Sequence, residues 1–532
     1  MDRSQFIYDK VPYPSLSFRW THPDHLATIA TLLGLDPAPV ERCRVLELGC
    51  ASGGNLIPMA YSLPQSEFVG IDLAEGHIAD GRAKIAALGL RNIDLQKMDI
   101  TDIQADFGEF DYIIVHGVYS WVSEGVRDKV LEICRQNLAP HGVAYISYNT
   151  FPGWRMLGVV RDMMLFHTRH LAEPNERVAE ARDLIDFLAG LTPSENSPHA
   201  SFLNTYLNYI NEWIVPKKDS YLLHEELEEI NEPIYFYQFA ERVAHHGLQY
   251  LADADFQGML VSNLPDDVAR KLGQMVRNTV ELEQYMDFIR NRLFRQSLLC
   301  HPGTRLGFKL TPECLARFHV ASSAQPETSE PDIHAQTVEN FKSADGATLK
   351  IDHPVSKAAF MYLGEIWPRS VSFNTLLNTA QARLNGSRKA NDSPNSEVDV
   401  KVLGANLLKA YGYSESLVGL HVHSPAFESN VSERPIGSPV ARLQARDDVL
   451  VTNLRHERVE LEDISHRLLP HLDGSRSRTD LLDILADLAA SGEIEVKQDD
   501  QIIEDRKQIR NLLDERLDAH LQQLANVALL IG

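Results

Sequence analysis

A short apolar strand that runs directly into a glycine-rich turn constrains this chain more than any other feature. Residues 45–54 read Val-Leu-Glu-Leu-Gly-Cys-Ala-Ser-Gly-Gly, which predicts a buried strand, a tight turn and the start of a helix. Glycine allows backbone angles and close approaches that a side chain would block. In open α/β sheets, such a turn lies at the carboxyl end of the first strand, where ligands bind in a crevice.

Strands and helices continue to alternate after this turn. The apolar runs are 44–49, 68–73, 93–98, 110–117 and 143–149. Amphipathic stretches of helical length lie between them, for example 75–89 and 124–138. Strands separated by such segments indicate βαβ units and a parallel sheet covered on both faces. We therefore predict an α/β, Rossmann-like fold with a mostly parallel sheet for this part of the chain.

Acidic residues occur at the strand ends where a nucleoside would need them. Glu47 is buried if the first strand is buried, so its carboxylate needs hydrogen-bond donors or a cation, such as a ligand ammonium group. Asp72 ends the second strand, where an acid accepts hydrogen bonds from both ribose hydroxyls. Asp99 follows the third strand and suits an adenine amino group. Each acid also has a structural alternative: a buried acid for Glu47 and helix capping for Asp72 and Asp99.

The spacing of the glycines narrows the choice of cofactor. A dinucleotide-binding turn reads G-x-G-x-x-G, but position 51 is alanine and the pattern here is E-x-G-x-x-x-G. A pyrophosphate cradle, and with it an NAD-linked oxidoreductase, is therefore disfavoured. A cofactor with a nucleoside and no phosphate fits better.

In this order, the features resemble those of class I S-adenosylmethionine-dependent methyltransferases. The resemblance implies S-adenosyl-L-methionine as the cofactor. The cofactor-binding residues that we predict are Glu47, Gly49, Gly53, Asp72, Leu73, Asp99, Ile100 and His116.

Flanking segments resemble methyltransferases that carry a regulatory domain. The matching segments are 8–14 (YDKVPYP), 148–154 (YNTFPGW), 223–227 (LHEEL), 231–236 (NEPIYF) and 291–299 (NRLFRQSLL). The C-terminal part is similar to the winged-helix-like tail of bacterial protein-lysine methyltransferases that act on outer-membrane proteins. The resemblance implies a protein side chain, with lysine favoured, as the methyl acceptor.

Aromatic and amide side chains follow the fourth and fifth strands, where the acceptor would enter. We predict acceptor contacts from Tyr119, Tyr148 and Asn149, and a lid over the site from Tyr13. Aromatic faces stabilise sulfonium and methylated ammonium groups by cation–π attraction. The alternative is that these aromatic residues only fill the core or an interface. No side chain stands out as an obligatory general base.

Three parts are expected along the chain. They are a methyltransferase domain over 1–170, a helical regulatory domain over 171–300 and a winged-helix-like substrate- or partner-binding region over 301–532. Segment 236–256 reads as a helix followed by a short strand, which either completes the first sheet or belongs to the helical part.

Composition limits the partners and the compartment. The 532 residues include 51 Lys and Arg against 74 Asp and Glu, a formal net charge of −23, which argues against nucleic acid as the main partner. Five cysteines without a CxxC pair, and the lack of an apolar leader or spanning segment, predict a soluble protein of a reducing compartment, the cytoplasm. His22, His245 and His246 are expected to be capping or surface residues rather than metal ligands.

Two other functions remain open from the sequence. One is a small-molecule methyltransferase of secondary metabolism, which would use the same cofactor site. The other is a non-catalytic cofactor-binding module whose remaining regions bind a partner. The long second half favours a protein acceptor, because a protein needs a docking surface that a small molecule does not.

Overall fold

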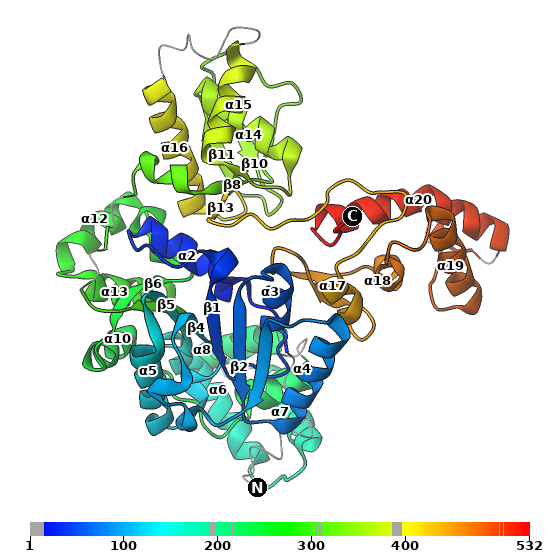
Figure 1. Ribbon diagram of the computed structural model, residues 1–532. Coiled ribbons are helices and arrows are strands. Elements are labelled where there is room, and N and C mark those ends of the chain that lie inside the picture. Colours follow the sequence, from blue (N-terminus) through cyan, green and yellow to red (C-terminus); the bar gives the residue numbers. More distant parts are fainter. Residues whose placement is uncertain are drawn as a thin grey trace.

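A seven-stranded, mostly parallel sheet forms the centre of the computed structural model (Figure 1). The structure describes residues 15–191, 198–214, 218–303, 306–307, 310–385, 396–498, 501–503 and 505–532. The strands are β1 (Arg44–Leu48), β2 (Glu67–Asp72), β3 (Ile93–Lys97), β4 (Phe110–Val115), β5 (Leu138–Asn149), β6 (Gln249–Asp253) and β7 (Phe294–Cys300). Their order is β3-β2-β1-β4-β5-β7-β6. The α/β, Rossmann-like fold that the sequence predicts is confirmed.

The order in which the strands are added to the sheet reverses beside β1. Strands β1 to β5 pair in parallel, with β1 between β2 and β4, whereas β7 pairs antiparallel with both β5 and β6. The chain crosses from β3 to β4 over β1, which opens a crevice at the carboxyl ends of β1 and β4. Strands β6 and β7 come from within 236–300, so part of the predicted middle segment lies in the central sheet.

Each face of the sheet is covered by its own set of helices. One buried cluster joins α2 (Pro23–Leu32), α3 (Leu56–Ser62) and α4 (Glu75–Leu88) to side chains such as Val45. The cluster on the opposite face joins α5 (Glu124–Asn137) and α10 (Phe236–His245) to side chains such as Leu46. Neighbouring residues of β1 thus face opposite clusters, as the two-residue period of a strand requires.

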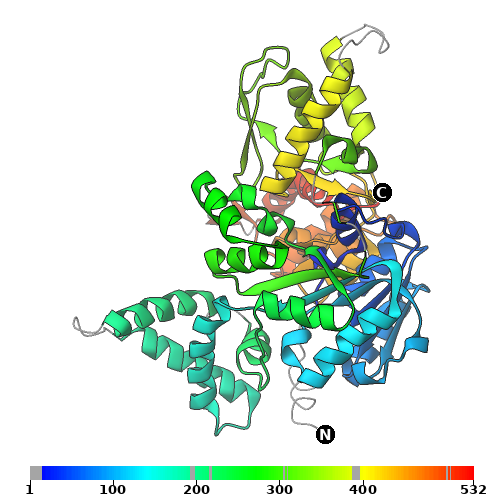
Figure 2. The ribbon, with the colours of Figure 1, turned by 90° about the vertical axis from the view of Figure 1, so that its left-hand side faces the viewer.

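A helical insertion separates β5 from α10. It contains α6 (Gly153–Thr168), α7 (Pro174–Ala189), α8 (Pro198–Ile214), the single turn α9 (Asp219–Tyr221) and a π-helical turn (Leu222–Glu226). These helices share their own buried cluster and project away from the sheet (Figure 2). Between β6 and β7 lie α11 (Phe256–Met259), α12 (Asp266–Met275) and α13 (Thr279–Arg290).

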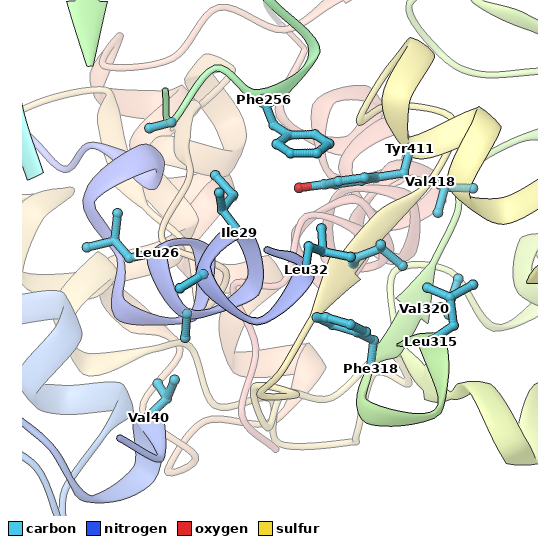
Figure 3. Close-up of a cluster of buried hydrophobic side chains, with 14 of the residues drawn as sticks. Leu26, Ile29, Leu32, Val40, Phe256, Leu315, Phe318, Val320, Tyr411 and Val418 are labelled. Carbon is cyan, nitrogen blue, oxygen red and sulfur yellow. The ribbon is translucent and has the colours of Figure 1, made fainter. Parts of the chain in front are cut away.

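The chain after β7 packs against α2. Its first part holds a sheet of β8 (His319–Ala321), β12 (Val371–Ser372) and β13 (Gly419–His421), a second sheet of β9 (Gln325–Pro326), β10 (Glu339–Lys342) and β11 (Thr348–Ile351), and helices α14 (Pro354–Ile366), α15 (Phe373–Asn385) and α16 (Ser396–Tyr413). Ile29 and Leu32 of α2 lie toward Tyr411 and Phe318, within one buried hydrophobic cluster (Figure 3). His22 caps α2, because its Nδ1 accepts the backbone N–H of Asp24 at 3.1 Å.

A separate hydrophobic core organises the last part of the chain. Its elements are α17 (Pro439–Gln444), β14 (Leu450–Thr452), β15 (Arg458–Glu460), α18 (Asp463–Leu468), α19 (Arg478–Ser491), β16 (Lys497–Gln498), β17 (Gln501–Ile502) and α20 (Arg506–Asn526). Strands β14 and β15 form an antiparallel hairpin. Across the described residues, no helix combines the length and the apolar character needed to cross a membrane.

Candidate active site

The glycine-rich turn leaves β1 in a conformation that its glycines allow. Gly49 and Gly53 have φ angles of 77° and 74°, in the left-handed region. The backbone N–H groups of Gly49 and Cys50 both donate to the carbonyl oxygen of Ile71, at 2.9 and 3.0 Å. A Cβ on Gly49 would lie 2.6 Å from Cγ2 of Val118, so the turn has no room for a side chain there.

Asp72 closes the turn from the end of β2. Its Oδ2 accepts the backbone N–H of Ala51 at 2.8 Å, and its Oδ1 accepts that of Ala74 at 2.9 Å. Ala51 has a φ of 46°, and the bond from Asp72 helps to hold this left-handed residue. The side chain of the next residue, Leu73, is exposed. A carboxylate and an apolar side chain therefore stand together beside the turn.

Glu47 lies inside β1 and is only 4% exposed. Its Oε1 accepts the side-chain amide of Asn55 at 2.8 Å, while its Oε2 has no hydrogen-bond partner among the described residues. Burial raises the pKa of Glu47 to about 8, although the hydrogen bond from Asn55 acts in the opposite direction. An unpartnered buried carboxylate oxygen at the carboxyl end of β1 fits a cofactor that carries an ammonium group.

The segment that precedes α2 lies over the turn. Ser15 Oγ accepts the backbone N–H of Gly54 at 2.8 Å, and the backbone N–H of Phe18 donates to Oδ1 of Asn55 at 3.0 Å. The Phe18 ring lies against that of His116, tilted by 36°, with 3.8 Å between centroids. Burial lowers the pKa of His116 to about 3, so the imidazole that follows β4 is neutral at physiological pH.

Asp99 and Ile100 stand at the end of β3. Asp99 Oδ1 accepts both the backbone N–H and the hydroxyl of Thr101, each at 2.8 Å, and so caps the short 3-10 helix Ile100–Asp102. This is the capping alternative that the sequence left open, and it occupies one of the two carboxylate oxygens.

The predicted acceptor residues separate in the structure. Tyr119 and Tyr148 are 0% and 1% exposed and pack with Phe239 of α10, at centroid distances of 5.4 and 4.2 Å. The Tyr148 hydroxyl lies 3.0 Å from Ser297 Oγ. Both tyrosines therefore make core contacts, because the alternation along β5 and the short helix after β4 direct them toward α10.

Of the other two residues predicted near the acceptor, the structure describes Asn149 but not Tyr13. Asn149 ends β5, and its side-chain amide donates to Oδ1 of Asn231 at 2.9 Å. Its backbone carbonyl accepts the N–H of Ile234 at 3.1 Å, which ties the segment before α10 to the mouth of the crevice. Tyr13, the predicted lid, lies outside the residues that the structure describes.

Two residues of the candidate site, Asn55 and His456, were not predicted from the sequence. Asn55 links Glu47 to Phe18 and Thr21, yet it stands in the sequence as one polar residue after a glycine pair. His456 reaches Asn55 from the C-terminal hairpin, with its Nε2 at 2.8 Å from Oδ1. Nothing in the local sequence around position 456 points to a residue 401 positions earlier.

Comparison with known proteins identifies the family. PKMT2 from Rickettsia typhi has the same overall fold, with a TM-score of 0.86 and 30% identity over 98% of this chain and 100% of that one. The chain belongs to the PKMT family of methyltransferases. A structure of the same relative in complex with AdoHcy, the product form of S-adenosylmethionine, matches with a TM-score of 0.85. An uncharacterized protein of Rickettsia prowazekii (strain Madrid E), RP789, is 35% identical over 98% of this chain and 93% of its own length.

Three family models divide this PKMT homologue. They are a methyltransferase domain over 45–142, a "Predicted methyltransferase regulatory domain" over 218–301 and a "PKMT, C-terminal winged helix domain" over 433–529. The protein is thus an S-adenosylmethionine-dependent methyltransferase with a winged-helix C-terminal domain, which confirms the predicted enzyme class and cofactor. A shorter match, 40% identical over 83 residues and 15% of this chain, is to the aklanonic acid methyltransferase DauC of Streptomyces sp. (strain C5).

Proposed function

We propose that this methyltransferase transfers its methyl group to lysine side chains of a protein. The observation that carries the proposal is the likeness to PKMT2 along the full length of both chains, which includes the winged-helix domain. An enzyme that acts on a small molecule would need only the cofactor domain. The match to DauC, a methyltransferase of this kind, covers only 15% of this chain. We likewise propose a division of the chain into three parts at about residues 170 and 300, in which β6 and β7 of the middle part complete the central sheet.

The residues around the glycine-rich turn have distinct roles in this proposal. Glu47 binds the ammonium group of the cofactor, and Gly49 and Gly53 let the backbone approach it. Asp72 accepts the ribose hydroxyls. Bound S-adenosylmethionine supplies a methyl group on a positively charged sulfur that needs no further activation. The enzyme then has to align the acceptor with that methyl group and exclude water.

The remaining cofactor contacts surround the base and the reacting end. Leu73 and Ile100 enclose the adenine, and the free oxygen of Asp99 accepts its amino group. The neutral imidazole of His116, in contact with Phe18, closes the crevice at the end of β4 without adding a positive charge that would repel the sulfonium.

The negative charge of the middle of the chain supports a cationic acceptor. Residues 171–300 carry 21 acidic against 11 basic side chains. Exposed Glu229 and Glu232 lie on the segment that Asn149 ties to the end of β5. These carboxylates attract a lysine-bearing segment from solution, and the attraction falls as salt increases. At the reacting end the lysine must lose its proton, which burial in the crevice favours. The side-chain oxygen of Asn149 suits the resulting neutral amine as a hydrogen-bond acceptor.

A labelling experiment tests the acceptor class. The protein is incubated with S-adenosylmethionine labelled in the methyl group, together with total protein or with a low-mass extract of the source cells. We expect label in protein, recovered as methylated lysine by mass spectrometry. The matched control is the same protein fraction with its lysines acetylated, which should take up almost no label. Label that persists after acetylation, or that occurs only in the low-mass fraction, would exclude lysine as the acceptor.

A further inference from the structure

The hairpin of the winged-helix domain reaches the glycine-rich turn of the methyltransferase domain. Strands β14 and β15 are joined by residues 453–457, and the tip of this turn lies beside Asn55. Two buried side-chain hydrogen bonds join the hairpin to residues at the turn and just before α2. His456 Nε2 is 2.8 Å from Asn55 Oδ1, and Thr452 Oγ1 donates to Ser17 Oγ at 3.0 Å. Both contacts are buried, so a domain more than 300 residues from the turn in sequence forms part of its surroundings.

The hydrogen bonds around Asn55 fix the orientation of its amide group. The backbone N–H of Phe18 can only donate, so the atom that it meets at 3.0 Å must be the amide oxygen, Oδ1. The amide nitrogen therefore faces Glu47 Oε1 at 2.8 Å. Since His456 meets Oδ1, its Nε2 must carry the proton and donate. His456, Asn55 and Glu47 thus form a chain of donors and acceptors with one consistent direction.

The position of His456 is itself strongly determined. Its φ is 62°, a left-handed angle that residues other than glycine and asparagine rarely adopt, and the residue is 4% exposed. Asn453 holds the turn, because its Oδ1 accepts the backbone N–H groups of both Arg455 and Glu457 at 2.9 Å. Burial keeps the pKa of His456 well below its usual value, so the imidazole stays neutral across the working pH range.

We propose that His456 is a positioning residue of the cofactor site, supplied by the winged-helix domain. Together with the Phe18 backbone N–H, it holds the Asn55 amide in place. The nitrogen of that amide donates to Oε1 of Glu47 and leaves the other oxygen, Oε2, for the cofactor. The same amide oxygen holds the Phe18 backbone, which keeps the aromatic ring against His116. The inference rests on the proposed role of Glu47, and it gives the winged-helix domain a part in binding S-adenosylmethionine.

Three full-length variants test the proposal by calorimetric titration with S-adenosylmethionine. His456→Asn suits the left-handed backbone, but its side chain is too short to reach Asn55; we expect the Kd to rise about tenfold, the loss of one buried hydrogen bond. His456→Gln restores an amide N–H at a similar reach, and its Kd should return close to that of the wild type. Leu485→Ala removes a fully buried side chain from the core of the same domain; it should lower the Tm and leave the Kd unchanged.

The outcomes separate this inference from the proposed role of Glu47. An unchanged Kd in His456→Asn, or an equal loss in Leu485→Ala, overturns the positioning role. If Glu47→Gln also binds as the wild type does, the proposed role of Glu47 fails; if Glu47→Gln binds weakly while His456→Asn does not, only the present inference fails.

Hydrogen exchange of the wild-type protein provides a second test that needs no variant. We expect saturating S-adenosylmethionine to slow backbone exchange at 453–457 together with 49–55. Protection of 49–55 alone would overturn the proposal, because a hairpin that positions Asn55 must itself be stabilised when the site is filled.

Discussion

The buried carboxyl group of Glu47 should make cofactor binding release a proton. Burial raises the pKa of Glu47 to about 8 in the free enzyme, so about 97% of the molecules carry a proton on this group at pH 6.5. An ammonium group beside Oε2 favours the carboxylate, so the proton leaves on binding. Ionising Glu47 at pH 6.5 costs about 2 kcal/mol, and the affinity for S-adenosylmethionine should rise about ninefold from pH 6 to pH 7.

Calorimetry in buffers of different ionisation enthalpy measures this proton directly. At pH 6.5 the observed binding enthalpy should vary with buffer enthalpy with a slope near one proton released per S-adenosylmethionine. His116, with its pKa lowered to about 3, and His456, whose pKa is also lowered, stay neutral and contribute nothing at this pH. Glu47→Gln is the matched control, because its side-chain oxygen still accepts the hydrogen bond from Asn55 while it has no proton to lose. Its slope should be near zero.

The same group should also make the free enzyme less stable at higher pH. The folded-state pKa lies above the unfolded value of 4.5, so the folded state holds this proton more tightly. The free energy of unfolding should therefore fall as pH rises from about 4.5 to about 8, by an amount of the order of 5 kcal/mol, and then level off. Glu47→Gln should lack this decline.

The binding experiment decides the reasoning as a whole. A wild-type enzyme that releases no proton when S-adenosylmethionine binds, or a Glu47→Gln variant that releases as much as the wild type, would refute it.

Three further substitutions have defined outcomes. Asp72→Ala removes the acceptor of two turn N–H groups and of the proposed ribose contact; the Kd for S-adenosylmethionine should rise at least tenfold by calorimetry, and an unchanged Kd would contradict the site. Tyr119→Phe removes a buried hydroxyl without a partner among the described residues. It should raise the free energy of unfolding by up to about 1 kcal/mol and leave kcat within twofold. A large loss of kcat would instead support the predicted contact of Tyr119 with the acceptor. Arg295→Met leaves buried Glu283 without its cation, and leaves Asp253 and Asp287 with Arg292 alone. It should cost about 3–5 kcal/mol in denaturant unfolding, and a smaller loss would show that the network is dispensable.

The strands that follow local sequence patterns could be predicted, whereas β7 could not be predicted from its own sequence pattern. Strands β1 to β4 begin within one residue of the predicted runs, since each is a short apolar segment between turn and helix signals. Strand β7 has a fully buried arginine, Arg295, at its second position, which no strand pattern anticipates. Its guanidinium pairs with Asp253 of β6 and with Glu283 and Asp287 of α13, so side chains distant in sequence compensate the charge that this strand buries.

In the candidate site, too, the residues set by local patterns could be predicted, but the contacts made by distant elements could not. The glycines of the turn and the acids at the strand ends share one edge because parallel strands have a common direction. The direction of Tyr148 was not predictable, because a residue at a strand end has two faces to choose from. The choice depends on Phe239, from a helix that follows a long insertion and stacks on the tyrosine ring.

The contacts of the C-terminal half explain why this enzyme is long in relation to its chemistry. Helix α2 covers one face of the central sheet, and its other side packs against Phe318 and Tyr411 of the region after β7 (Figure 3). The winged-helix hairpin then meets the segment just before α2 and the turn just after β1. A chain cut after β7 would therefore expose the outer side of α2 and lose the donor to Asn55 together. The proposed cofactor site is thus built from distant parts of the sequence, and the region that we propose to bind the protein acceptor also contacts this site.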